Sequence, residues 1–174
     1  WYEMRKIVIL IPVFNDWESF KKLIAEINAN ISNFKETHFE CLVVNDASTI
    51  DQPQLTRPSN IKSLEILNMK ENRGHARCNA FGIRHVLQKK DFDYLILMDG
   101  DGEDRPIEIK SLVEAINNKP NVSVVAKRVK RSEGLFFQSL YQAHKLITLI
   151  FTGHIIIFGY DCVLTMVDVK EFDS

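Results

Sequence analysis

The chain has almost no net charge and few cysteines. Its 174 residues carry a formal net charge of −1 at pH 7, so nothing in the total charge favours nucleic acid, and any charge-driven binding has to be local. The three cysteines, Cys41, Cys78 and Cys162, are odd in number and widely spaced. This pattern is typical of reduced thiols and favours a cytoplasmic location.

Long hydrophobic runs are also missing. No segment of about 18 consecutive apolar residues occurs, so no membrane-spanning helix is predicted. The N-terminus leads directly into a strand-like segment, without the charged, apolar and small-residue regions of a signal peptide. The hydrophobic content of 45% is sufficient for a single buried core, and the length fits one domain.

Short apolar runs alternate with amphipathic segments along most of the chain. The runs, which are rich in β-branched residues and typical of buried strands, lie at residues 6–11, 39–44, 63–67, 93–98 and 122–126. Helical spacing predicts a first helix with Phe20, Leu23, Ile24, Ile27 and Ile31 buried and Asn15 or Asp16 as N-cap.

A second predicted helix has Ala76, Ala80, Ile83 and Leu87 on one face, and a third begins at Pro106. Alternating strands and helices predict an α/β fold with a mostly parallel central sheet between helical layers. Ligands bind such sheets beyond the carboxyl ends of the strands. The polar segments PVFND, NDAST and DGDGED follow three of the predicted strands, so we expect them to converge there.

Acidic residues are concentrated after the fourth predicted strand. Asp99, Asp101, Glu103 and Asp104 lie within six residues, with two glycines between them. Carboxylates this close repel one another unless a cation or hydrogen-bond donors stabilise them. A D-x-D sequence at a strand end suits Mg²⁺ or Mn²⁺, because hard cations prefer carboxylate oxygens, and the glycines would let a diphosphate approach the backbone. The alternative is a solvated acidic turn that caps the helix at Pro106.

Other ligand classes are excluded by spacing. An EF-hand loop beginning at Asp99 needs glycine at its sixth position and a carboxylate at its twelfth, where the chain has Asp104 and Lys110. The three cysteines and five histidines are too scattered for a zinc site. No G-x-x-x-x-G-K-[ST] sequence is present, and Pro12 replaces a glycine fingerprint after the first strand. P-loop and Rossmann dinucleotide sites are therefore excluded.

Four motifs, ILIPVFND, VVNDAST, NRGHARCNAFG and LMDGDGEDRP, occur in this order. Together they resemble the signature of family 2 glycosyltransferases of the GT-A fold, over roughly residues 6–131. The D-x-D-x-E sequence followed by proline is similar to the polyprenyl-phosphate and dolichyl-phosphate sugar transferases of that family. The resemblance implies a Rossmann-like three-layer fold and an inverting, metal-dependent transfer of sugar from a nucleotide diphosphate sugar.

The resemblance also implies roles for individual residues, with Asp16 standing where the family usually has glutamate. The implied roles are nucleotide binding by Pro12, Phe14, Asp16, Asp46, Gly74 and Asp99, binding of Mg²⁺ or Mn²⁺ by Asp99, Asp101 and Glu103, catalysis by Asp101 and Arg128, and phosphate or acceptor binding by Arg128 and Arg131. Three simpler interpretations remain open: Phe14 belongs to the core, Asp46 caps a turn before Ser48, and NRGHARCNAFG is only a helix start.

The basic cluster of Lys127, Arg128, Lys130 and Arg131 follows the fifth predicted strand. It is either a solvated loop or a cationic segment that stabilises a departing nucleotide diphosphate or binds a phosphate acceptor. The next segment, residues 135–151, predicts a helix with one apolar face. Such a helix either packs on the sheet or, beside the basic cluster, rests peripherally on an anionic membrane at its cytoplasmic face.

The sequence predicts a nucleotide-sugar-binding GT-A core over residues 1–131 and an acceptor-side segment over 132–174. The acceptor is a polyprenyl phosphate or a sugar; a sugar hydroxyl needs a general base, and neither Asp104 nor Asp161 is well placed, which favours phosphate. Two alternatives stay open: a sugar nucleotidyltransferase, and a non-catalytic nucleotide-sugar-binding module. The histidines expected to be structural or surface residues are His75, His85, His144 and His154.

Overall fold

The computed structural model describes residues 4–89, 91–102, 104–118, 124–127 and 162–168. The chain divides into two units, Trp1–Ala126 with Leu164–Ser174 and Lys127–Val163, and nearly all described residues belong to the first. The predicted helix over 135–151 lies outside the described residues. The predicted division at residue 131 stays a prediction.

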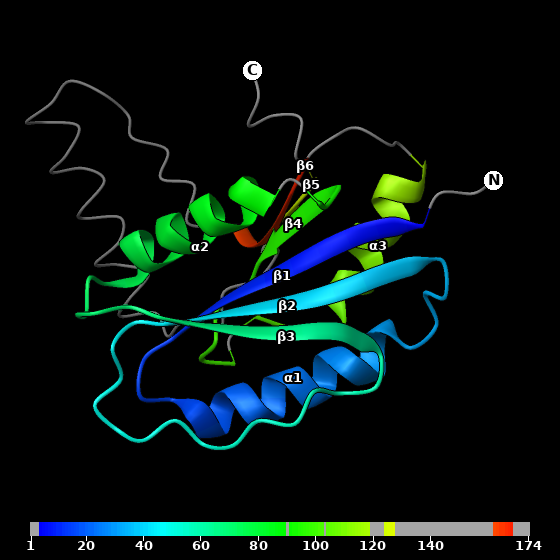
Figure 1. Cartoon of the computed structure of the whole chain (residues 1–174). Helices are drawn as coiled ribbons and strands as arrows, with labels where there is room; N and C mark the ends of the chain where they lie inside the picture. Colours follow the sequence, from blue (N-terminus) through cyan, green and yellow to red (C-terminus); the bar gives the residue numbers. More distant parts are fainter. Residues whose placement is uncertain (1–3, 90, 103, 119–123, 128–161, 169–174) are drawn as a thin grey trace, which may run out of the picture. The chain divides into compact units, whose positions relative to one another are not determined.

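The described elements follow one another in the order β1-α1-β2-β3-α2-β4-α3-β5-β6 (Figure 1). The strands are β1 (Arg5–Val13), β2 (Thr37–Asn45), β3 (Ile61–Asn68), β4 (Tyr94–Leu97), β5 (Val124–Lys127) and β6 (Cys162–Asp168). The helices are α1 (Trp17–Ile31), α2 (His75–Lys89) and α3 (Glu108–Asn118). All predicted strands and helices within the described residues are present, with ends shifted by a few residues. Strand β6 is not predicted by the sequence.

The sheet has the strand order β3-β2-β1-β4-β6-β5. Strand β1 pairs in parallel with β2 and β4, so that Ile9 lies between Cys41 and Ile96, and β2 pairs in parallel with β3. Strand β6 is antiparallel to β4. The sheet is therefore mostly parallel, as predicted, and the four parallel strands end at one common edge.

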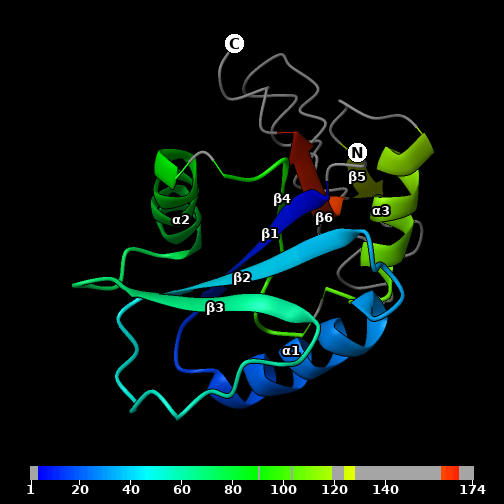
Figure 2. The same ribbon diagram turned by 45° about the vertical axis from the view of Figure 1, so that its right-hand side comes forward.

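Helices cover both faces of the sheet. Alternate residues of β1 point to opposite faces: Ile7 and Ile9 belong to the cluster formed with α1 and α3, whereas Val8 and Leu10 pack with α2. Figures 1 and 2 show α2 on one side of the sheet and α1 with α3 on the other. This is the predicted three-layer arrangement. None of the described helices is long and apolar enough to span a bilayer.

Helix α1 follows its predicted pattern, and its N-cap is Asp16, whose Oδ1 accepts a hydrogen bond from the Ser19 backbone N–H at 3.3 Å. Helix α3 begins two residues later than predicted, at Glu108. A turn precedes it, in which the N–H of Glu108 donates to the carbonyl of Arg105 at 2.9 Å. Pro106 lies in this turn and is buried.

The buried face of α2 is not the predicted one. The alanines at positions 76 and 80 are exposed, and Ile83 and Leu87 are half-buried. The fully buried residues of the helix are Cys78, Gly82 and Val86. A Cβ atom on Gly82 would lie 2.5 Å from Leu10 Cδ1, so α2 packs closely on β1 at this glycine, and a larger residue would require the Leu10 side chain to shift. The prediction was therefore wrong for the two alanines, whereas Ile83 and Leu87 do pack against the core; the sequence missed Gly82 because glycine contributes nothing to hydrophobic periodicity.

Cys41 and Cys78 are buried free thiols. Burial raises the pKa of each thiol to about 12, with a further contribution from the Asp46 charge at Cys78. Both groups are therefore protonated and unreactive near neutral pH, as expected for core cysteines.

Candidate functional site

Three loops meet where β1, β2 and β4 end. The loop after β2 continues beside β1, since the N–H of Asp46 donates to the Val13 carbonyl at 2.9 Å. The loop after β4 also stays close to β1, with the N–H of Met98 donating to the Leu10 carbonyl at 3.0 Å. The three polar segments thus converge on one edge of the sheet, which is where a doubly covered parallel sheet binds its ligands.

An open pocket of about 230 Å³ lies at this edge. Its lining residues are Pro12, Val13, Phe14, Asp16, Asp46, His75, Cys78, Asp99, Gly100 and Asp101. This volume is somewhat below the roughly 300 Å³ at which the typical range of pockets for small molecules begins. Six side chains chosen from the sequence share one pocket.

The β1 side of the pocket carries an aromatic ring and a carboxylate. Phe14 is 46% exposed, which rules out the interpretation of this residue as core. Asp16 is exposed at the same time as it caps α1. An exposed ring at a pocket edge offers a flat apolar surface on which a nucleobase can stack.

Asp46 is 4% exposed, and both of its carboxylate oxygens accept backbone hydrogen bonds. Oδ1 accepts from the N–H of Arg73 at 2.8 Å, and Oδ2 accepts from the N–H of Gly74 at 2.9 Å. The carboxylate therefore fixes the start of α2 to the end of β2. The turn before Ser48 is capped by Asn45 instead, whose Oδ1 accepts from the Ser48 N–H at 2.9 Å. Each oxygen of Asp46 keeps a second lone pair for a ligand.

The loop after β4 carries Asp99 and Asp101 into the pocket. Between them, Gly100 is buried, and a Cβ atom at this position would lie 2.6 Å from the Pro12 carbonyl oxygen. Because that atom belongs to the backbone, it cannot move aside as a side chain can. Glycine at position 100 thus allows the acidic loop to lie directly against the end of β1.

Asp104 is a buried residue of the same loop and bonds back to its start. Its side chain is 4% exposed, and Oδ2 accepts a hydrogen bond from the Asp99 backbone N–H at 2.7 Å. Burial raises the pKa of the Asp104 carboxyl to about 7; the bond from Asp99 opposes this, and the charges of Asp99, Asp101 and Glu108 add to it. Asp104 does not line the pocket and is a structural carboxyl.

His75, which was expected to be a structural or surface residue, is exposed and also lines the pocket, a position that the sequence did not predict. Its Nε2 lies 3.3 Å from Asp99 Oδ1 and 2.8 Å from Asn79 Nδ2, so it links the start of α2 to the acidic loop. The available signal was its position: it directly follows Gly74 at the start of a helix, after a parallel strand, and helices after such strands begin at the carboxyl edge.

The remaining predicted site residues are placed as follows. Gly74 does not line the pocket and contributes its backbone N–H to Asp46. Glu103, Arg128 and Arg131 lie outside the described residues. Their assigned roles stay predictions.

The loop after β4 is predicted to bind a divalent cation. Asp99 and Asp101 supply carboxylate oxygens to one pocket, which fits a hard divalent cation. Within the described residues, which leave out Glu103, no three His, Cys, Asp or Glu side chains are close enough together to hold a metal ion. The described part of the loop thus offers two of the three predicted ligands.

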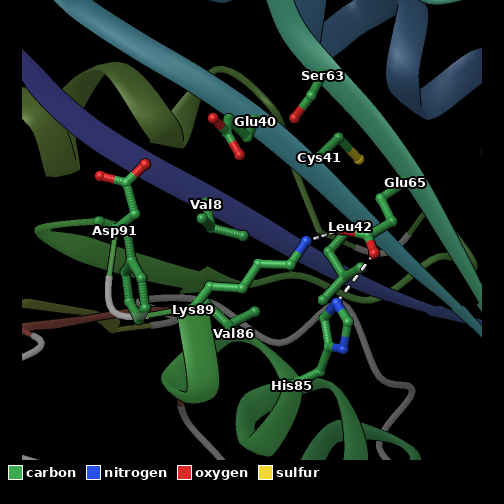
Figure 3. Close-up of a pocket in the computed structure, with 11 residues that line it drawn as sticks. Val8, Glu40, Cys41, Leu42, Ser63, Glu65, His85, Val86, Lys89 and Asp91 are labelled. Carbon is green, nitrogen blue, oxygen red and sulfur yellow. Dashed lines mark hydrogen bonds and ion pairs between the residues drawn. The ribbon is translucent and has the colours of Figure 1, made fainter.

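A second pocket lies near the opposite edge of the sheet, where β4 begins and α2 ends (Figure 3). Within it, Glu65 contacts both His85 and Lys89. Burial acts to raise the pKa of Glu65, but the bonds from Lys89 and His85 lower it below its ordinary value. Glu65 is thus paired with Lys89 and His85, and the pocket lies away from the strand ends that bind ligands, so we interpret the cluster as structural.

Comparison with known proteins identifies the family. Residues 8–169 match the family described as Glycosyl transferase family 2, and the chain belongs to it. A curated relative, the undecaprenyl-phosphate 4-deoxy-4-formamido-L-arabinose transferase of Salmonella paratyphi A, is 29% identical over 150 residues, which cover 84% of this chain and 43% of the relative. The enzyme of the same name from Klebsiella pneumoniae is 26% identical over 139 residues, covering 78% and 41%. The chain spans less than half the length of these relatives.

Solved structures show the same fold. The mannosyltransferase PcManGT of Pyrobaculum calidifontis, in complex with GDP-Man and Mn²⁺, gives a TM-score of 0.56 at 15% identity, covering 96% of this chain and 45% of that protein. TarS 1–349 of S. aureus, in complex with UDP-GlcNAc, gives 0.55 at 18% identity, covering 75% and 36%. The described unit has the GT-A fold, as predicted.

Proposed function

We propose that this chain binds a nucleotide diphosphate sugar in the pocket at the carboxyl edge, as part of an inverting, metal-dependent glycosyltransferase. The supporting observation is that Asp99 and Asp101 line the same pocket as Phe14 and Asp46. Carboxylates suited to a divalent cation thus share a site with a ring suited to a nucleobase. The GDP-Man, UDP-GlcNAc and Mn²⁺ named for the structural neighbours agree with such a donor and cofactor.

Residues on different sides of the pocket would bind different parts of the donor. Pro12, Phe14 and Asp16 border the base, Asp46 holds the base or ribose, and Asp99 with Asp101 and Glu103 binds Mg²⁺ or Mn²⁺. A bound cation would offset the negative charge of the donor diphosphate. Arg128 would stabilise the same charge as the diphosphate leaves, because a guanidinium makes two hydrogen bonds to phosphate oxygens.

The proposed acceptor is a polyprenyl phosphate. Its phosphate is already an anionic nucleophile, whereas a sugar hydroxyl requires a general base. Asp104 is a poor base, since its carboxyl is buried and bonded to the Asp99 amide rather than facing the pocket. The undecaprenyl-phosphate transferases among the relatives are consistent with this acceptor.

Calorimetry with UDP and GDP, with and without Mn²⁺, tests donor binding and identifies the base. We expect nucleotide binding to require Mn²⁺. Asp101→Ala should weaken nucleotide binding at least roughly tenfold, because one metal ligand is lost. Asp91→Ala is the matched control: it removes an acidic side chain at the opposite edge, where Asp91 forms an exposed ion pair with Lys6. Affinity unchanged by EDTA would contradict the metal assignment.

The non-catalytic module is the main alternative. It predicts nucleotide binding without sugar transfer or donor hydrolysis, so a turnover assay with undecaprenyl phosphate separates it from the enzyme. A sugar nucleotidyltransferase would need a glycine- and arginine-rich loop after β1, and the chain has PVFND there.

Peripheral membrane contact is the last part of the proposal, since a polyprenyl phosphate resides in the membrane. Arg128 and Arg131 would attract anionic lipid, and the attraction should weaken as salt screens it. Co-sedimentation with anionic vesicles, using wild type and an Arg128→Ala/Arg131→Ala variant, measures this. Failure of the wild type to sediment at low salt would favour a sugar acceptor.

A further inference from the structure

Asn15 joins the loop after β1 to the loop after β2 through both its backbone and its side chain. Its backbone N–H donates to Ser48 Oγ at 2.9 Å. Its Oδ1 accepts from the backbone N–H groups of Thr49 at 2.7 Å and Ile50 at 3.2 Å. Its Nδ2 donates to Thr49 Oγ1 at 3.0 Å. Thr49 Oγ1 also donates to Oδ1 at 3.2 Å, so one residue makes five hydrogen bonds to a segment more than thirty positions away.

The backbone of both loops depends on these bonds. Asn15 has φ of 59° and Ala47 has φ of 56°, a left-handed conformation that is unfavourable for most residues and tolerated by asparagine. A chain adopts such angles at two facing positions only when surrounding contacts hold it there. The contacts that hold these loops include the hydrogen bonds of Asn15, the bond from the Ser48 N–H to Asn45 Oδ1 and the bond from the Asp46 N–H to the Val13 carbonyl.

The bonded atoms lie just behind the pocket. Asn15, Ser48 and Thr49 do not line it, but the residues on both sides of Asn15 do, and so does Asp46 in the facing loop. We infer that Asn15 is a positioning residue for the donor nucleotide. Its side-chain amide fixes the distance between its neighbours in the pocket, Phe14 and Asp16, and the loop that carries Asp46. This inference rests on the proposed function.

Loss of this connection removes no pocket side chain, but the relative position of the two sides of the pocket is less well fixed. Phe14 is 46% exposed and has no dense packing to fix it, and Asp46 is fixed separately through the start of α2. Without the amide, the two loops stay connected through the Asp46 N–H on the Val13 carbonyl and the Asn15 N–H on Ser48 Oγ, but the chain beyond Val13 loses the side-chain bonds of Asn15 that restrict its position relative to the facing loop. A ligand that contacts both sides then has to order them on binding, which lowers affinity.

The test compares Asn15→Gly with a matched control. Glycine keeps the positive φ accessible and removes the amide, so the variant isolates the side-chain bonds. The control is Asn28→Ala in α1, because Asn28 Oδ1 likewise accepts a backbone hydrogen bond from a distant loop, from the N–H of Asn60 at 2.8 Å, near the start of β3. Each variant is measured for thermal midpoint and for the Kd of UDP and GDP with Mn²⁺.

We expect Asn15→Gly to raise the nucleotide Kd by roughly tenfold or more, from the loss of several hydrogen bonds, and Asn28→Ala to leave it within about twofold at a comparable thermal midpoint. Asn15→Asp keeps the oxygen that accepts the two amides and should retain most of the affinity. Thr49→Val, which removes only the hydroxyl that bonds to Nδ2 and Oδ1 of Asn15, provides a milder variant if Asn15→Gly does not fold, and should raise the Kd about threefold.

Two results overturn the inference in different ways. Wild-type affinity in Asn15→Gly, or equal losses in Asn15→Gly and Asn28→Ala, would show that Asn15 is merely structural while the proposed function stands. Absence of nucleotide binding by the wild-type chain, with or without Mn²⁺, would overturn the proposed function and this inference with it.

Discussion

The substitution Asp104→Asn should stabilise the protein, and the gain should grow with pH. Asp104 is a buried carboxyl, and charging it inside the protein is costly because it loses water. Asparagine has nearly the same shape, carries no charge and keeps a carbonyl oxygen that can accept the hydrogen bond from the Asp99 N–H. The substitution therefore removes the charge while keeping the loop contact.

The magnitude follows from the pKa of this group in the two states. The pKa rises from 3.8, the ordinary value, to about 7 in the folded protein. Between these values the folded state binds the proton and the unfolded state does not, so the contribution of Asp104 to the free energy of unfolding is fully present below pH 3.8. It is lost as the pH rises through about 7. The full difference between the two pKa values corresponds to about 4 kcal/mol in the free energy of unfolding.

Urea unfolding of wild type and Asp104→Asn between pH 4.5 and about 8 measures this, in EDTA, because a bound cation would favour the charged carboxylate. The difference in free energy of unfolding should widen by a few kcal/mol across this range. Asp93→Asn is the control: Asp93 Oδ2 also accepts a backbone hydrogen bond, from the Lys6 N–H at 2.8 Å, but the residue is exposed. A constant difference between wild type and Asp104→Asn would refute the reasoning.

Three further substitutions test the geometry of the pocket. Asp46→Ala leaves two backbone N–H groups without their acceptor and should lower the free energy of unfolding by about 2–4 kcal/mol. It should also weaken nucleotide binding but not Mn²⁺ binding. Wild-type stability in urea would contradict the expected loss. Ala47→Gly relieves a φ of 56° and should raise the free energy of unfolding by about 1 kcal/mol; a lower thermal midpoint would argue against strain there. Gly100→Ala forces a Cβ atom against the Pro12 carbonyl and should cost about 1–3 kcal/mol and weaken Mn²⁺-dependent nucleotide binding. Unchanged unfolding and binding would mean that the acidic loop does not lie against β1.

The sequence alone determined the layout of the described unit. Apolar runs separated by amphipathic segments specify a parallel sheet covered on both faces, because that arrangement buries both sides of each run. The same rule placed the segments around Phe14, Asp46 and Asp99 at one edge, since parallel strands end together. Their presence in a single pocket needed no information beyond the order of strands and loops and the motifs that resemble the family.

Only the tertiary structure decided what these residues contact. Asp46 bonds to amides 27 and 28 positions away, and Asn15 to a loop more than thirty positions away; periodicity describes which face a residue is on but not its partner across a turn. The packing of Gly82 on β1 and the position of β6 beside β4 were likewise missed. Burial, which makes Asp104 differ from Asp99 and Asp101, arises only when distant segments pack around a side chain.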